Sequence, residues 1–509
     1  NFCYPEYALV AWASKKLNKP VRWTATRSEL FISDHQARDH NSSSRLAIAA
    51  DGKFIALEIN SVANLGAYMV GSSGGVQVVQ YANLPGTVYK IPSICLNISA
   101  VFTNKTPTGV FRGPGYAETN LILERLIDAA AQKYNLDRLE LRRKNFINKG
   151  DIPFTDVLGE SVDSGDFPGI FEQLITRIDL AGFEQRKIKS KERGFLRGLG
   201  VACFIKGTGG APKENVEIRF TSGSRIDLLT GTQSIGQGHE TTFPQILAKC
   251  FGVSCDVINL KQADTDLIET GGGHGSSRAT YMGGSALHYA AAEVIKKGKQ
   301  LAANVLEVAV QDILFENGRF IVDGTDREVG LFELAALAEK NGSSLNTYNL
   351  WERQAMTFPN GVHAAELEVD SETGKVKLNR YLVVDDYGVI INPLLVEGQV
   401  HGAVTNGIGQ ALLEGVMFDP ESGQTLTGSF MDYSVARAAD LLDYHIEFKS
   451  TTCTTNPLGV KGCGEGGTVA ATPAVINGVV DALSEYGVSH LDGPVTSSKI
   501  WKLISAERR

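Results

Sequence analysis

One carboxylate stands in a run that is almost free of other side chains. Glu465 lies within residues 461–468 (KGCGEGGT), and an Ala- and Val-rich segment follows over 469–483. Glycine lets the backbone approach a ligand closely, and the amide-rich start of a helix favours an anion. If the loop is buried, its apolar surroundings should raise the pKa of Glu465 toward neutrality, which suits a general base. The pattern therefore predicts that Glu465 is a catalytic residue.

The same glycines also fit the G-x-G-x-x-G pattern of a dinucleotide-binding turn, through positions 462, 464 and 467. That fingerprint needs a strand that runs into the first glycine and an acid about 20 positions further on. Residues 454–459 are turn-forming instead, and Asp481 falls inside a helical pattern. An NAD(P)- or flavin-dependent dehydrogenase that uses Gly462 is therefore one alternative, and a purely structural turn is another.

Four further loops place glycines around one or two polar residues just before a helical pattern. They are 110–116 (VFRGPGY), 236–241 (GQGHET), 271–278 (GGGHGSSR) and 397–402 (EGQVHG). Backbone amides, amide side chains and hydroxyls arranged in this way suit a large, polar, phosphate-bearing cofactor. No Gly-Lys-Ser/Thr follows any of these loops, so the pattern does not predict a Walker phosphate loop.

The composition of the 509 residues, with 43% hydrophobic and 21% charged residues, is typical of a globular chain of two to four domains. A net charge of -8 argues against nucleic acid as the main partner. No apolar run reaches the roughly 18 residues that a membrane span needs. Seven scattered cysteines and nine scattered histidines predict neither a disulfide framework nor a zinc or iron–sulfur site. These features predict a cytoplasmic protein.

The element pattern predicts an α+β fold of mixed sheets with hairpins and packed helices. Hairpins are expected over 45–62, 217–229 and 365–384, a short strand over 21–25, and helices over 6–18, 118–134, 240–250, 286–310, 395–414 and 469–485. This mixed order is typical of α+β architecture rather than of a doubly wound parallel sheet. The charged segment 184–194 predicts a boundary between a first domain, 1–183, and a second, 184–509, which carries Glu465.

The five loops together resemble a known family. The chain is similar, over essentially all its residues, to the molybdopterin-binding large subunit of the xanthine dehydrogenase, aldehyde oxidase and aerobic carbon monoxide dehydrogenase family. The motifs that carry the resemblance are Phe111-Arg112-Gly113, Gly236-Gln237-Gly238, Gly275-Ser276-Ser277, Gly398-Gln399-Val400 and Gly464-Glu465.

The resemblance implies a molybdenum hydroxylase whose metal is held by the pterin dithiolene and not by protein side chains. In the family, the glutamate matching Glu465 takes a proton from a metal-bound hydroxide, which attacks an electron-poor carbon while hydride passes to a sulfido ligand. Arg112 is implied to be catalytic, with a loop-anchoring salt bridge as its alternative role. The cofactor-binding residues implied are Phe111, Gly113, Gly236, Gln237, Gly238, His239, Thr241, Gly275, Ser276, Ser277, Gln399 and Gly464.

The family also implies cofactors and partners. Molybdopterin cytosine dinucleotide is expected rather than plain molybdopterin, with [2Fe-2S] and FAD on partner subunits and a dimer of such heteromers. Family members carry a long upstream portion with a Gly-Gly-x-Phe-Gly pterin loop, which a further chain or a longer form of this one is expected to supply. The alternative to an enzyme is a scaffold subunit that assembles a complex without catalysing a reaction.

The substrate loop departs from two branches of the family. Residues 112–116 lack the cysteine that binds copper in aerobic carbon monoxide dehydrogenases. Purine hydroxylases clamp their substrate between two phenylalanines and orient it with an acid and an arginine. Here Phe204 matches one ring, Pro114 replaces the other, Asn1 stands in place of the acid, and Tyr81 or a neighbour stands in place of the arginine. Pro114, Tyr116 and Phe204 are predicted to line the substrate pocket, and a neutral aromatic N-heterocycle or an aldehyde is favoured over xanthine.

Overall fold

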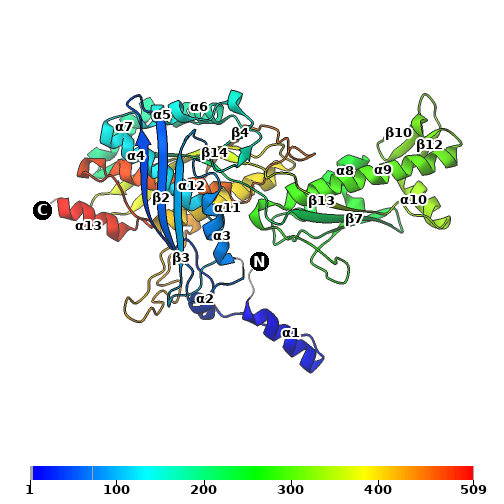
Figure 1. Cartoon of the computed structure of the whole chain (residues 1–509), viewed down its shortest axis with the longest axis horizontal. Coiled ribbons are helices and arrows are strands. Elements are labelled where there is room, and N and C mark those ends of the chain that lie inside the picture. The colour runs from blue at the N-terminus through cyan, green and yellow to red at the C-terminus, as the bar shows by residue number, and fades with distance from the viewer. Residues whose placement is uncertain (1–3, 72, 508–509) are drawn as a thin grey trace.

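The computed structural model describes residues 4–71 and 73–507. Helices and mixed sheets occur throughout these residues, so the predicted α+β class is confirmed. Figure 1 shows a body and an arm that projects to the right, coloured green. The arm comprises residues 213–352, and the body comprises the remaining described residues.

The arm is built on a four-stranded sheet with the order β13-β7-β8-β9. These strands are β7 (Lys213–Thr221), β8 (Arg225–Thr230), β9 (Ile258–Lys261) and β13 (Thr347–Glu352), with α8 (His239–Phe251) and α9 (Gly284–Leu306) beside them. The tip consists of β10 (Ile313–Glu316), β11 (Arg319–Val322), β12 (Glu328–Gly330) and α10 (Leu331–Lys340). Phe243, Phe251 and Phe320 are buried in one apolar cluster, so the arm has a core of its own.

The central sheet of the body carries the helix that follows Glu465. Its order is β16-β15-β14-β6, from β6 (Phe195–Ile205), β14 (Asn360–Asp370), β15 (Val376–Asp386) and β16 (His445–Phe448). On it lies α12 (Gly466–Ala482), flanked by α11 (Pro393–Leu412) and α4 (Tyr116–Tyr134). Every residue of α12 except Asp481 is buried, and most are small or apolar, as expected of a helix that is covered all round.

Glycines on β6 allow α12 to lie against the sheet. A methyl group on Gly200 would overlap the carbonyl oxygen of Ala474 in α12, and one on Gly198 would overlap that of Gly478. Residues two apart in a strand face the same side, so the two glycines form one flat strip under the helix. This strip fixes the depth of α12 and therefore the position of Glu465 at its start.

Gly200→Ala is expected to destabilise the body by about 1–3 kcal/mol, because the helix must move away from the strand. The measurement is the free energy of unfolding in urea. The matched control is Gly150→Ala, since a methyl group at Gly150 meets no atom within 4 Å. Equal stabilities for the two variants would contradict the close-packing argument.

The remaining elements form the N-terminal side and the outer layer of the body. β1 (His40–Ile48), β2 (Phe54–Asn64) and β3 (Ile94–Val101) form a three-stranded sheet, antiparallel between β1 and β2 and parallel between β2 and β3. The others are α1 (Pro5–Leu17), α2 (Arg27–Ser33), α3 (Ser73–Val79), α5 (Arg138–Asn145), β4 (Phe154–Thr155), β5 (Ser161–Val162), α6 (Phe167–Ile178), α7 (Leu180–Glu192) and α13 (Ser497–Glu507).

A fully buried ion pair joins α5 to α4. Arg142 donates to Glu124 from Nε at 3.0 Å and from a terminal nitrogen at 2.6 Å, and both side chains are 0% exposed. Arg142 also donates to Asp128 at 2.8 Å, and the Tyr89 hydroxyl donates to Glu124 at 2.7 Å. The pair is thus satisfied on both sides, which is the condition for ionic groups in a protein interior.

Most predicted elements are confirmed with small shifts of their ends. The three hairpins correspond to β1–β2, β7–β8 and β14–β15. The helix predicted over 286–310 ends at Leu306, because Glu307 adopts a left-handed backbone with φ 53°. The strand predicted over 21–25 is wrong, since none of these residues pairs with a described strand.

The predicted boundary segment 184–194 lies mostly within α7. Arg186 of this helix pairs with Glu366 of β14 at 2.7 Å, so the segment is attached to the central sheet. The division into 1–183 and 184–509 stays a prediction.

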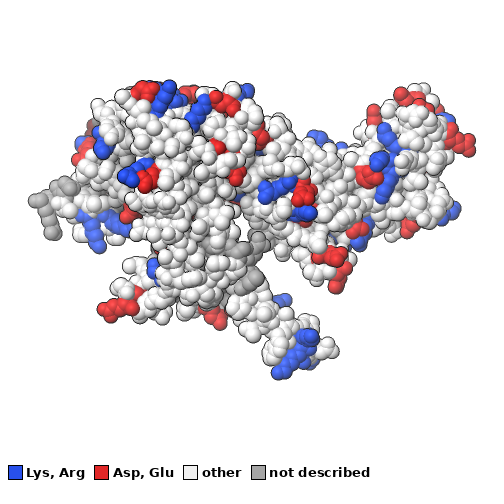
Figure 2. All heavy atoms as spheres, viewed as in Figure 1, with Lys and Arg blue, Asp and Glu red and all other residues white. Residues whose placement is uncertain are grey.

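The surface carries both signs of charge. On the face in Figure 2, lysine and arginine are interspersed with aspartate and glutamate over the body and the arm. Among residues 4–71 and 73–507, no helix is long and apolar enough to cross a membrane. The six cysteines in these ranges, at 95, 203, 250, 255, 453 and 463, are free thiols.

Candidate active site

Glu465 is the residue immediately before α12, and its side chain is 12% exposed. Three donors reach its carboxylate. Oε1 accepts from the Gly113 amide at 3.0 Å, and Oε2 accepts from Lys206 Nζ at 2.5 Å and Ser277 Oγ at 2.7 Å. The acid is therefore held between three segments that lie far apart in the sequence, one of them in the arm.

The expectation of a raised pKa is wrong. Burial alone would raise the pKa of Glu465, and it is the largest single influence. The positive charge and hydrogen bond of Lys206, with the donors Ser277 and Gly113, outweigh burial and hold the pKa below its usual value. Glu465 is thus an ionised carboxylate at neutral pH.

Lys206 was not predicted from the sequence. It follows directly after β6, is 1% exposed, and also donates to Ser276 Oγ at 3.3 Å. The sequence did hold a signal, because Lys206 ends the apolar run of β6 and precedes Gly207, as polar residues do in the other loops. A lysine at the end of a buried strand needs a partner acid, and the strand gave no indication of which one.

Arg112 joins three of the predicted loops. It donates to the Gly464 carbonyl at 2.6 Å, to the Gln399 carbonyl at 3.0 Å and side-chain oxygen at 3.2 Å, and to Asn406 Oδ1 at 3.1 Å. All these acceptors are neutral, so Arg112 anchors the loops by hydrogen bonds rather than by the salt bridge considered as its alternative role. The positive charge of the guanidinium lies near Glu465 and interacts electrostatically with its carboxylate.

The start of the Glu465 loop is anchored by a second buried lysine. Lys461 Nζ donates to Asp386 Oδ2 at 2.7 Å, and both side chains are 0% exposed. A methyl group on Gly462 would overlap the Ser277 carbonyl, and one on Gly464 would lie 3.0 Å from Ser277 Oγ. Glycine is required at both positions because the serine loop of the arm, residues 275–277, packs directly against the Glu465 loop.

The serine loop has an unusual backbone. Ser276 and Ser277 have φ of 64° and 56°, a left-handed conformation that is uncommon outside glycine. They belong to the short helix η4 (Gly275–Ser277). The turn points both hydroxyls at the body, toward Lys206 and Glu465.

The Gly236–Thr241 loop lies at the start of α8 and contacts the site through α11. Gly238 has φ 83°, and a methyl group there would lie 2.7 Å from Leu395 of α11. Gln237 is bonded within its own loop, where it accepts from the Ile235 amide. Among the described residues, no hydrogen bond joins this loop to Glu465, whereas the Gln399 loop is joined to the site through Arg112.

Of the predicted substrate residues, Pro114 and Tyr116 belong to the loop of Arg112, and Phe204 lies in β6. Pro114 and Tyr116 are buried, and Phe204 is 0% exposed, with its ring edge-on to His363 at 5.7 Å. A methyl group on Gly466 would lie 2.8 Å from Phe204, so that ring supports α12. Tyr81 is also fully buried. The substrate roles of these residues stay predictions, and Asn1 lies outside the described residues.

Phe111 is exposed, and the Arg38 guanidinium lies 5.4 Å from the centre of its ring. Arg38 also donates to the Arg112 carbonyl. The loop is therefore fixed on its outer side as well.

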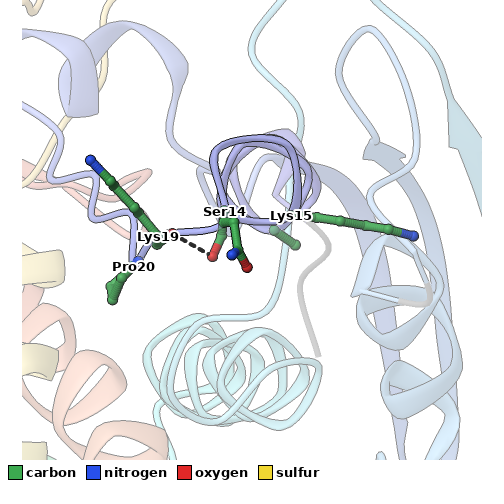
Figure 3. Close-up of a pocket in the computed structure, with 6 residues that line it drawn as sticks. Ser14, Lys15, Lys19 and Pro20 are labelled. Carbon is green, nitrogen blue, oxygen red and sulfur yellow. Dashed lines mark hydrogen bonds between the residues drawn. The ribbon is translucent and has the colours of Figure 1, made fainter.

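The hollow drawn in Figure 3 lies away from this site, beside α1. It is lined by Ala11, Ser14, Lys15, Asn18, Lys19 and Pro20. Ser14 Oγ donates to the Lys19 carbonyl at 2.8 Å, which closes the end of the helix. Its lining residues include two lysines but no carboxylate or histidine, so we assign the chemistry of the chain to the Glu465 region.

The comparison with known families decides the identity of the chain. The family described as "Molybdopterin cofactor-binding domain" matches residues 173–442, more than half of the chain, and again residues 1–146. The chain belongs to the molybdopterin-binding large subunits of the xanthine dehydrogenase family.

Relatives from this family align along almost the whole chain. The carbon monoxide dehydrogenase large chain of Hydrogenophaga pseudoflava is 31% identical, over 98% of this chain and 65% of its own length. Subunit gamma of the 6-hydroxypseudooxynicotine dehydrogenase complex of Paenarthrobacter nicotinovorans is 33% identical, over 98% of this chain and 64% of its own length. The chain thus spans about two thirds of the length of these relatives.

A solved structure shares the fold. Quinoline 2-oxidoreductase from Pseudomonas putida 86 superposes with a TM-score of 0.93 at 32% identity, covering 99% of this chain and 67% of that one. The fold of the molybdopterin-binding subunit is therefore present in these residues.

The residues of the site fit a polar cofactor. His239 and His274, from two of the glycine loops, each bury Nδ1 without a hydrogen-bond partner. A buried polar atom without a partner is costly, and a ligand that bonded to it would remove that cost. Backbone amides at the left-handed turns of Gly238 and Ser276 add donors of the kind that phosphate groups use.

Proposed function

We propose that the chain is the large subunit of a molybdenum hydroxylase, which hydroxylates an electron-poor carbon with water as the source of oxygen. The observation that carries the proposal is the buried, ionised carboxylate of Glu465 at the point where four polar loops meet. The two relatives described above are dehydrogenases of the same family.

The side chains divide into holding and reacting groups. Gln399, Ser276 and Ser277, with the turns at Gly236–Thr241, would hold the pterin and its nucleotide tail. Arg112 keeps the loops together and adds positive charge, which suits an anionic cofactor. When bound, the molybdenum cofactor supplies the reactive oxygen and takes up two electrons. Glu465 accepts the proton that this chemistry releases, since it starts ionised and has lost most of its water.

We propose an aromatic N-heterocycle as the substrate, with an aldehyde as the second choice. The nicotine 6-hydroxylase large subunit of Paenarthrobacter nicotinovorans is 31% identical, and quinoline 2-oxidoreductase is 32% identical. Both names denote N-heterocyclic substrates. Residues 112–116 contain no cysteine, which argues against the copper-dependent oxidation of carbon monoxide.

The complete enzyme would contain more than this chain. We propose molybdopterin cytosine dinucleotide as the form of the cofactor, and iron–sulfur and FAD subunits as electron acceptors in a dimer of heteromers in the cytoplasm. The relatives support this assembly, because one of them is named as a subunit of a complex and each is longer than this chain. The extra length would supply the upstream pterin loop.

Metal and nucleotide analysis of the assembled complex tests the proposal. We expect about one molybdenum atom per chain, and cytidine monophosphate after acid hydrolysis, because the nucleotide tail is released with the pterin. The same complex from cells unable to make the pterin serves as the control. Tight NAD(P) or flavin binding by this chain, without molybdenum, would support the dehydrogenase alternative instead, although no strand runs into Gly462 among the described residues.

A further inference from the structure

The two oxygens of Glu465 are not equivalent. Oε2 accepts two hydrogen bonds, from Lys206 at 2.5 Å and Ser277 at 2.7 Å, whereas Oε1 accepts one, from the Gly113 amide at 3.0 Å. An ionised carboxylate offers about two acceptor positions on each oxygen. Oε2 is therefore saturated, and Oε1 retains one free position.

Lys206 is built into the site as a fixed cation. Its backbone amide donates to the Pro359 carbonyl at 2.9 Å, and its ammonium group lies 5.7 Å from the ring of Tyr116. The ammonium group also donates to Ser276 Oγ at 3.3 Å, and the side chain is 1% exposed. The protein thus surrounds this charge, which cannot reorient toward solvent.

We propose that Lys206 is a positioning residue for Glu465, whose ammonium group occupies Oε2 and leaves Oε1 as the oxygen that accepts the proton. The inference rests on the proposed function, in which Glu465 is the base. In this step the proton moves to Oε1, and Lys206 keeps its own proton throughout. Lys206 therefore acts through Glu465 and does not react itself.

Several other ionisable groups lie near the carboxylate or near Arg112, which interacts electrostatically with it. They are Arg112 from the loop before α4, Tyr116 from α4, Tyr387 after β15, and Cys463 from the loop of Glu465 itself. Burial raises the pKa of both tyrosines, and it raises that of Cys463 to about 11, so all three are neutral near pH 7. Arg112 donates only to neutral acceptors. Lys206 is thus the cation that contacts the carboxylate.

Kinetics of the complete, cofactor-loaded complex provide the first test. Lys206→Met, which removes the charge, should lower kcat by about 10–100-fold, since the base is misplaced, while KM changes by less than about threefold. The acid limb of the kcat–pH profile should move to higher pH, because the pKa of Glu465 is no longer held down. Lys206→Arg keeps the charge and should keep the acid limb in its native position. Native kcat and acid limb in Lys206→Met would overturn the proposal.

Thermal unfolding gives a second test that needs no turnover. Without Lys206 the buried Glu465 should have a raised pKa, and its contribution to stability is then lost as pH rises through that value. The unfolding temperature of Lys206→Met should therefore fall below that of Lys206→Met/Glu465→Gln by a margin that widens from about pH 4.5 to about pH 7. A constant or narrowing margin would overturn the coupling between the two residues.

These readouts separate the two proposals. A complex without molybdenum would refute the proposed function, yet the unfolding comparison would still measure the coupling between Lys206 and Glu465. If Lys206→Met does not fold, Lys206→Gln replaces it in both tests, because glutamine keeps a hydrogen-bond donor without the charge. The expected changes in kcat, in the acid limb and in the unfolding temperature are the same.

Discussion

Glu465→Gln is expected to lower kcat by about 10²–10⁴-fold, which is the usual contribution of a general base. Glutamine has the same shape as glutamate and can still accept from the Gly113 amide, but it cannot take up a proton. The loop contacts of Arg112 and Gly464 do not involve this side chain, so the cofactor should remain bound. The measurement is kcat at matched molybdenum content.

The control for this variant is Glu485→Gln. Glu485 is exposed and pairs with Lys191 on the surface, so its loss should leave kcat unchanged. Native turnover in Glu465→Gln with a full complement of molybdenum would exclude Glu465 as the base. Loss of molybdenum from the variant would assign the residue to cofactor binding instead.

Arg142→Met should destabilise the body by about 3–5 kcal/mol, since it leaves the Glu124 carboxylate buried without its cation. Glu124 would keep the Tyr89 hydroxyl as a donor, but two hydrogen bonds from the guanidinium would be lost. Because α4 also packs on α12, the variant should lose activity at lower urea concentrations than the native chain. Unfolding in urea, followed by circular dichroism, measures the effect.

Arg143→Met is the matched control one residue further along α5. Arg143 pairs with Glu140 and Glu172 on the surface, where ion pairs contribute about 0–1 kcal/mol. A similar loss of stability in the two variants would mean that the helix itself, and not the buried pair, is responsible.

Much of the site could be predicted because glycine loops are local signals. Glu465, Arg112, Ser277 and Gln399 are each marked by glycines next to a helical pattern, and the structure brings these four residues together. The hairpins could be predicted for the same reason. The β1–β2 turn depends only on Gly52, which has φ 89°, and on the residues next to it in the sequence.

The direction in which the pKa of Glu465 is shifted could not be predicted, because it depends on Lys206, which lies 259 positions away in the sequence. Lys206 follows directly after β6 of the central sheet, and the packing of α12 on β6 brings it to the carboxylate. Phe204 shows the same limit. Its contact with Gly466 depends on how α12 packs on β6, and its role in the substrate pocket, implied by the resemblance, stays a prediction.

The two donors on Oε2 come from different folded units, since Lys206 extends from the body and Ser277 from the arm. A small tilt of the arm would therefore change the basicity of the Glu465 carboxylate. It would withdraw one hydroxyl from the carboxylate, and it would also disturb the apolar cluster of Tyr281, Met282 and Val460 that joins the arm to the body. A ligand or partner that shifted the arm relative to the body would thereby change how strongly Glu465 binds a proton.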